Sequence, residues 1–70
     1  MRDVQVTKHG AFQAATAPGA DGGFVAWAKM GPITGDCPVS EPGEHVWFCF
    51  GASRDEALRA VLADVGLSNA

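Results

Sequence analysis

The residues of this chain best suited to chemistry are two cysteines, Cys37 and Cys49, and two histidines, His9 and His45. Two thiolates with two imidazoles form a ligand set that holds zinc tetrahedrally. Structural zinc sites place their ligands in close pairs of cysteines, whereas Cys37 stands alone and Cys49 lies among aromatic residues, as a small core residue does. The sequence therefore predicts neither a metal site nor a cofactor.

Cys37 is also the candidate nucleophile of a thiol enzyme, with His45 or His9 as its base. A reactive thiol needs a nearby base and a lowered pKa. Nothing in the spacing brings these residues together, and the charge of Asp36 would raise the pKa of the neighbouring thiol. A chain of 70 residues can hardly enclose a catalytic pocket. We expect a protein that is not an enzyme.

The two tryptophans, Trp27 and Trp47, are better suited to contact another macromolecule. Tryptophan is enriched in binding hot spots, and it also stacks on nucleic-acid bases. Base stacking normally works beside a basic groove, and Lys29 is the one cation near these rings in the sequence. We expect the tryptophans in the core or at a protein interface, and as a hot spot if they share a sheet face. The predicted partner-binding residues are Trp27, Trp47, Val25, Lys29 and His45.

Composition limits the classes of partner. Five Lys and Arg against eight Asp and Glu give a net charge of −3, which argues against direct nucleic-acid binding. The sequence contains no run of about 20 apolar residues and no signal-peptide pattern. Two cysteines are too few for the disulfide framework of a small secreted domain. We expect a cytoplasmic protein that binds no membrane, with both thiols reduced.

The clearest predicted element is a C-terminal helix over 53–65. Ser53 and Glu56 have the spacing of a capping box, in which each side chain accepts a hydrogen bond from the other's backbone N–H. Gly66 fits a left-handed residue that ends the helix. The apolar residues recur at helical spacing and form one stripe: Leu58, Val61, Leu62 and Val65.

The rest of the chain predicts strands and turns. Alternating and β-branched residues indicate a hairpin, closed by the turn Asp21-Gly22-Gly23, and a later strand rich in aromatic residues. The whole chain is expected to be one small domain, 1–70. Its predicted parts are an N-terminal strand extension or tail (1–10), a hairpin (11–30), a loop rich in glycine and proline (31–43), a strand (44–51) and the helix (53–65). The predicted fold class is α+β, order β-β-β-α, with a three- or four-stranded antiparallel sheet and the helix packed on one face.

The predicted strands carry bulky residues at both parities, so both faces of the sheet are apolar. One helix covers one face only. The other face is then covered either by the long loop or by a partner, because exposed apolar patches on small proteins are commonly interaction sites. A chain this short also gains from a second subunit, so a homodimer is an open expectation.

The order of elements resembles the HicB antitoxin family. The resemblance is carried by Asp21-Gly22-Gly23-Phe24-Val25-Ala26 on the second strand and by Ser53-Arg54-Asp55-Glu56-Ala57-Leu58 at the helix start, within residues 11–65. It implies a partial RNase H-like or double-stranded-RNA-binding-like fold that covers and inhibits a small ribonuclease toxin. The loop from Gly31 to Glu44 is longer than in that family and lacks its Leu-Pro-Gly-Cys run. Scaffolds persist while sites vary, so this departure bears on function more than on fold.

Three functional hypotheses follow. The first is a non-enzymatic inhibitor or adaptor of the HicB-like antitoxin type, which binds a partner protein such as a ribonuclease toxin through a sheet face or edge strand. The second is a phage or mobile-element inhibitor, such as an anti-CRISPR protein, whose acidity steers it to a nucleic-acid-binding surface of a host defence complex. The third is a small thiol enzyme that uses Cys37.

Overall fold

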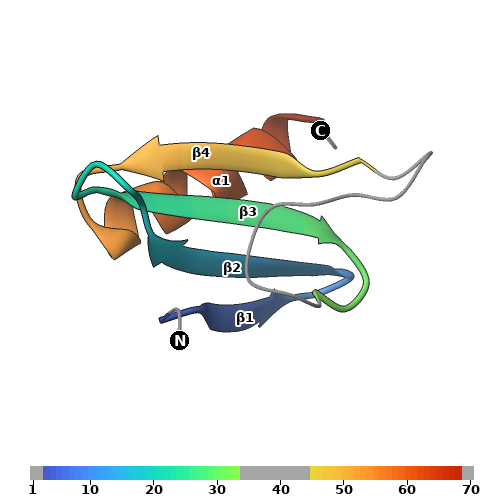
Figure 1. Cartoon of the computed structure of the whole chain (residues 1–70). Helices are drawn as coiled ribbons and strands as arrows, with labels where there is room; N and C mark the ends of the chain where they lie inside the picture. Colours follow the sequence, from blue (N-terminus) through green and yellow to red (C-terminus); the bar gives the residue numbers. More distant parts are fainter. Residues whose placement is uncertain (1–2, 34–44, 69–70) are drawn as a thin grey trace.

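The computed structural model describes residues 3–33 and 45–68, which form a four-stranded antiparallel sheet and one helix. The strands lie in the order β1-β2-β3-β4, so each is hydrogen-bonded to its neighbour in the sequence (Figure 1). Their bounds are β1 Gln5–His9, β2 Phe12–Pro18, β3 Phe24–Met30 and β4 Trp47–Gly51, and α1 spans Arg54–Ser68. The predicted α+β class, with an antiparallel sheet followed by one C-terminal helix, is confirmed.

The turn between β2 and β3 follows from its residues. Gly22 has a φ of 93°, a left-handed conformation that glycine adopts without steric cost. The Asp21 carboxylate accepts a hydrogen bond from the Gly23 N–H at 3.3 Å, and the Gly19 N–H donates to the Gly23 carbonyl at 2.7 Å. These contacts set the register that pairs Pro18 with Phe24 and Ala15 with Trp27. The turn predicted at Asp21-Gly22-Gly23 is confirmed.

The helix begins where the cap predicts, although the cap differs in detail. Ser53 Oγ accepts a hydrogen bond from the Glu56 N–H at 3.2 Å, but the Glu56 carboxylate accepts from the Ala52 N–H at 3.1 Å instead of that of Ser53. The step from β4 to α1 is tight, because a Cβ at Gly51 would lie 2.5 Å from the Ala57 nitrogen. The predicted end at Gly66 is wrong: Gly66 has no positive φ, and α1 continues to Ser68.

Other element bounds also differ from the sequence expectations. The segment 1–10 contains a separate edge strand, β1, which is the fourth strand that the sequence left open, and β2 ends at Pro18. Strand β4 starts at Trp47, so His45 and Val46 precede it. Of the predicted loop, residues 31–33 contain no helix or strand, and residues 34–43 lie outside the described residues.

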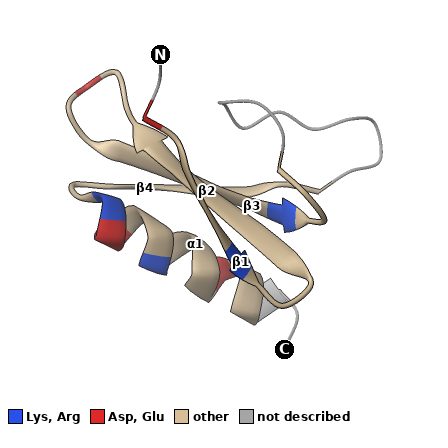
Figure 2. Ribbon diagram, turned by 90° about the horizontal axis from the view of Figure 1, so that it is seen from below, with Lys and Arg blue, Asp and Glu red and all other residues tan. Residues whose placement is uncertain are grey.

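One face of the sheet packs against α1, and its core is made of small side chains. Figure 2 shows the sheet and the helix as two layers. Alanines on β2 and β3 allow a close approach by the helix, whose apolar stripe faces them. The buried residues of this layer are Ala14, Ala26, Ala28, Ala57, Val61 and Val65, and Leu58 and Leu62 pack at its margin. The apolar stripe predicted from the sequence is thus the part of α1 that contacts the sheet.

Arg54 connects the start of the helix to β2 and to the N-terminal segment. Its Nη1 donates to the carbonyl and to Oγ1 of Thr16 at 3.1 and 2.8 Å, and Thr16 is buried. Its Nη2 donates to the Asp3 carboxylate at 2.8 Å. The guanidinium also lies over the Phe24 ring, 5.0 Å from its centroid. One side chain therefore provides the polar partner of a buried threonine and holds three segments together.

The opposite face, called the open face here because α1 does not cover it, contains a second and smaller core. Trp27 is its centre, only 2% exposed, beside Ala15 and Ala17. The chain leaving β3 folds back over this face, where the Ile33 N–H donates to Gln13 Oε1 at 3.0 Å and Ile33 packs on the cluster. Within the described residues, chain next to β3 therefore covers Trp27 but does not cover the whole open face.

Candidate protein interaction surface

The uncovered part of the open face lies over β4. Because Trp47 and Cys49 face the helix, strand alternation turns Phe48 and Phe50 to the open face. Phe48 is 54% exposed and Phe50 is 70% exposed, and the two rings make an edge-to-face contact with centroids 5.9 Å apart. Phe50 is paired across the strands with Val25. We call Val25, Phe48 and Phe50 the β4 patch.

A hollow beside the β4 patch extends it toward the β2–β3 turn. The hollow encloses about 460 Å³ and is lined by all three patch residues together with Pro18, Gly19, Ala20 and Asp21. Its walls are mainly apolar, with the Asp21 carboxylate as the charged group at its rim. A shape of this kind fits a protruding apolar side chain of a partner.

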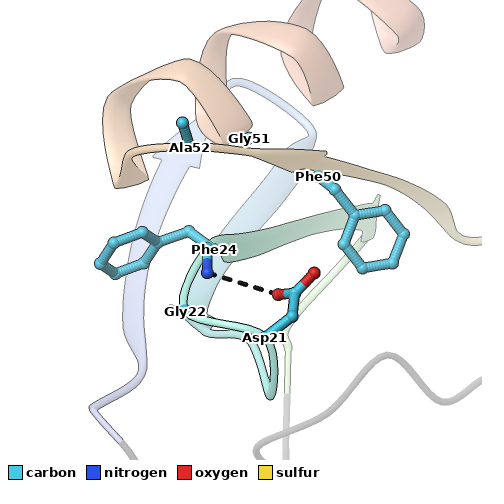
Figure 3. Close-up of a pocket in the computed structure, with 7 residues that line it drawn as sticks. Asp21, Gly22, Phe24, Phe50, Gly51 and Ala52 are labelled. Atoms are coloured by element: carbon cyan, nitrogen blue, oxygen red, sulfur yellow. Dashed lines mark hydrogen bonds between the residues drawn. The ribbon is translucent and has the colours of Figure 1, made fainter.

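A second hollow, of about 440 Å³, lies on the other side of the same turn. Figure 3 shows it between Asp21, Gly22 and Phe24 of the turn and Phe50, Gly51 and Ala52 at the end of β4. The Asp21 carboxylate lies between the two phenylalanine rings and is held by the Gly23 N–H. Asp21 and Phe50 thus line both hollows, so the surface continues around the end of β4.

The two edges of the sheet differ in polarity. Within residues 3–33 and 45–68, β4 is hydrogen-bonded to β3 and to no other strand, so it is an edge strand. Its sequence, Trp-Phe-Cys-Phe-Gly, contains no charged residue and no proline, and Figure 2 shows no coloured position along it. The other edge, β1, carries Lys8 and His9 and is exposed throughout. Charged edges resist strand pairing, and uncharged edges permit it.

The structure places two predicted partner-binding residues, Val25 and Lys29, on the open face. Both are half-buried on β3, with Val25 inside the β4 patch. Trp27 lies between them, but it is buried, so its ring offers almost no surface to a partner. Its role within the described residues is to fill the smaller core.

Trp47 and His45 lie elsewhere. Trp47 is half-buried in the helix-side layer, with the Phe12 ring 5.5 Å away and the exposed His45 ring 4.5 Å away between centroids. The two tryptophans therefore lie on opposite faces of the sheet, so they do not form one hot spot.

Two of the groups considered for catalysis and metal binding, Cys49 and His9, lie on opposite edge strands. Cys49 is on β4 and His9 is on β1, the opposite edge strand, and the His9 Nε2 is 2.7 Å from Thr7 Oγ1. Burial, and secondly the negative charge of Asp64, raise the pKa of the Cys49 thiol, which disfavours the reactive thiolate. No cluster of three metal-ligating side chains occurs in the described part of the chain, and Cys37 lies outside it.

Sequence reasoning missed Phe48 and Phe50 as surface residues. The signal was present, since β4 has aromatic residues at both parities, and only one parity can face a single helix. What the sequence does not give is the position of β4 at the sheet edge, where no neighbouring strand or loop among the described residues shields its outward side chains.

Comparisons with protein-family models, with curated proteins and with solved structures give no significant match to this chain. Among the described residues, no helix has both the length and the hydrophobicity needed to cross a bilayer.

Proposed function

We propose that this chain is a protein-binding module, of the inhibitor or adaptor kind, whose β4 patch docks on a partner protein. The observation that carries the proposal is the exposure of two adjacent phenylalanines, Phe48 and Phe50, on a sheet face that α1 does not cover. Aromatic side chains in such positions are frequent anchors of protein interfaces.

The surroundings of the patch support docking of a shaped apolar group. The hollow next to it receives one side chain, and the rim residue Asp21 is available to a cation of the partner. The rigid support comes from β3, where Val25 pairs with Phe50 and buried Trp27 pairs with Phe48. A preorganised patch loses little conformational entropy on binding.

The partner to test first is a small ribonuclease of the toxin type. The HicB resemblance implies it, and a net charge of −3 favours encounter with a basic protein. Catalysis by the chain itself is not part of the proposal; Cys37, the nucleophile of the thiol-enzyme hypothesis, lies outside the described residues.

The test compares retention of the partner by four forms of the immobilised chain, using extracts of cells that naturally encode it and then the purified partner. Wild type and Val6→Ser are expected to retain the partner, whereas Phe48→Ser and Phe50→Ser are expected to weaken binding at least tenfold. Val6 is a matched control because it is 46% exposed on the same face but lies on β1, away from the patch. Equal retention by all four forms would refute the proposal.

The alternative inhibitor, which docks on a basic nucleic-acid-binding surface, is supported by a different region. Asp55, Glu56 and Asp64 are exposed on α1, where the Asp55 carboxylate pairs with Arg59. For that function, Asp64→Lys would abolish binding and the phenylalanine variants would not. The same capture experiment therefore separates the two functions by which variant loses the partner.

A further inference from the structure

We propose that a second copy of this chain is the partner of the β4 edge: two β4 strands pair antiparallel about Cys49 and join two sheets into one eight-stranded sheet. This inference concerns the outer edge of β4 and does not rest on the proposed function, although Phe48 and Phe50 take part in both.

The edge itself is suited to strand pairing. Over its five residues β4 has neither charge nor proline, and its outer edge pairs with no strand among residues 3–33 and 45–68. Natural sheets protect edges that must stay unpaired with lysine, proline or a bulge. The β1 edge has such protection in Lys8, and β4 does not. Within residues 3–33 and 45–68, one edge is therefore protected and the other is suited to strand pairing.

The sequence of β4 is complementary to itself in one register. Antiparallel pairing about Cys49 overlaps all five residues, whereas a shift by two residues loses part of the ladder. In this register each Phe48 lies opposite Phe50 of the second copy, and both point to the open face. Side chains directly opposite in an antiparallel pair are in contact, and aromatic pairs are favourable there. The ring pair within one chain, 5.9 Å between centroids, thus becomes a cluster of four rings.

The composition of the core explains why a second copy is useful to the fold. The buried positions of both layers are mostly alanine: Ala14, Ala15, Ala17, Ala26, Ala28 and Ala57. Alanine buries little apolar surface, and a chain of 70 residues has little other surface to bury. Pairing β4 with its copy brings Phe48 and Phe50, the large aromatic residues that the single chain leaves exposed, into contact with the rings of the second copy.

The first experiment measures the mass of the purified chain by light scattering over a dilution series. We expect twice the 7.2 kDa of one chain at high concentration. Phe50→Lys places a charge opposite Phe48 of the second copy and is expected to halve the mass. Val6→Lys introduces the same charge at an exposed position of the other edge strand and is expected to leave the mass unchanged. Circular dichroism checks that both variants are folded.

The second experiment tests the register and does not depend on the folding of a surface variant. In the Cys37→Ser chain, mild oxidation is expected to join two chains through Cys49. Residues directly opposite in an antiparallel pair have Cα atoms about 4.5–5.5 Å apart, within the range of about 4.4–6.8 Å that a disulfide spans. Cys37→Ser/Cys49→Ser is the control and is expected to stay unlinked.

The outcomes are decisive in both directions. A dimer that Phe50→Lys dissociates and Cys49 links supports the inference. A monomer at every concentration, a dimer that only Val6→Lys dissociates, or a dimer that Cys49 never links overturns it. If the chain is monomeric while Phe48→Ser still loses its protein partner, the dimer is refuted and the proposed function stands. If the chain is dimeric and Phe48→Ser still retains the protein partner, the proposed function alone is refuted.

Discussion

The two faces of the sheet achieve burial in opposite ways. On the helix side many small residues, such as Ala26 and Ala28, allow the backbone of α1 to come close, and Val61 fills the space between. On the open face one large ring, Trp27, is covered by short segments of chain that include Ile33. Small side chains fill the core where α1 packs closely on the sheet, whereas one large side chain fills the core on the open face.

This difference also explains which aromatic side chains stay exposed. The helix side is covered along β3 and β4, so Trp47 and Cys49 are half-buried. On the open face the described residues cover Trp27 and its neighbours, and Phe48 and Phe50 stay exposed. The proposed interaction surface thus begins where this covering ends.

The largest expected effect is removal of the open-face core. Trp27→Ala leaves a cavity with no element to collapse into it, and we expect the free energy of unfolding to fall by about 3–5 kcal/mol. Urea unfolding followed by circular dichroism measures it. Trp27→Phe keeps a ring in place, so its free energy of unfolding should fall by clearly less. Equal losses for the two variants would contradict the role of ring volume.

A larger side chain in the helix-side core should reduce stability by less than removal of the Trp27 ring does. Ala26→Leu inserts a branched side chain where α1 packs on β3, and we expect a loss of about 1–3 kcal/mol in the free energy of unfolding. Ala63→Leu is the matched control, because Ala63 is exposed on α1. If the two substitutions had the same small effect, close approach of the helix would not depend on small residues.

Arg54 joins the helix side to the N-terminal segment, and its replacement should cause the next largest loss of stability. Arg54→Met removes both hydrogen bonds to Thr16 and leaves that buried hydroxyl without its partner. We expect a loss of about 1–2 kcal/mol. Thermal unfolding of Arg54→Met is compared with that of the double variant Arg54→Met/Thr16→Val. The double variant lacks the unpaired hydroxyl, so it should recover part of the lost stability.

The β4 patch should contribute little to the stability of the single chain. Phe50→Ser changes an exposed residue, so we expect a change below about 1 kcal/mol at concentrations where the chain is monomeric. Val25→Ser, at a half-buried patch position on β3, should cost more. A large loss for Phe50→Ser would show that its ring serves the fold.

The smallest effect concerns the thiol on the helix side. The pKa of Cys49 is raised, so in the Cys37→Ser chain alkylation by iodoacetamide should be slower than for a free thiol at the same pH. Because the folded pKa exceeds the unfolded one, the linked stability is present below the unfolded pKa and is lost as pH rises through the folded pKa. Asp64→Asn should speed the reaction, and no change would exclude the charge of Asp64 as a cause.

Much of the fold was predictable because its signals are local. The turn at Asp21-Gly22-Gly23, strand 24–30 and the helix start at Ser53 each depend on residues within a few positions of one another. The helix end was not predictable from Gly66, because glycine also occupies ordinary helical conformations.

The site was predicted less well than the fold. Val25 lies in the β4 patch, whereas Trp27 and Trp47 were chosen because tryptophan is frequent in binding hot spots, and residue type does not distinguish a core ring from an interface ring. Which residues are exposed depends on which strand lies at the edge and on where the chain after β3 folds back, through the Gln13 to Ile33 hydrogen bond. These are long-range contacts that spacing does not encode.

The contact between Arg54 and Asp3 has a consequence for the order of folding. The two residues are 51 positions apart, so the ion pair closes a loop that contains the whole sheet. Closing so long a loop costs more entropy than closing the short hairpins, which therefore have the faster route to form. We expect the helix start and the amino terminus to come together late in folding, after the strands are aligned.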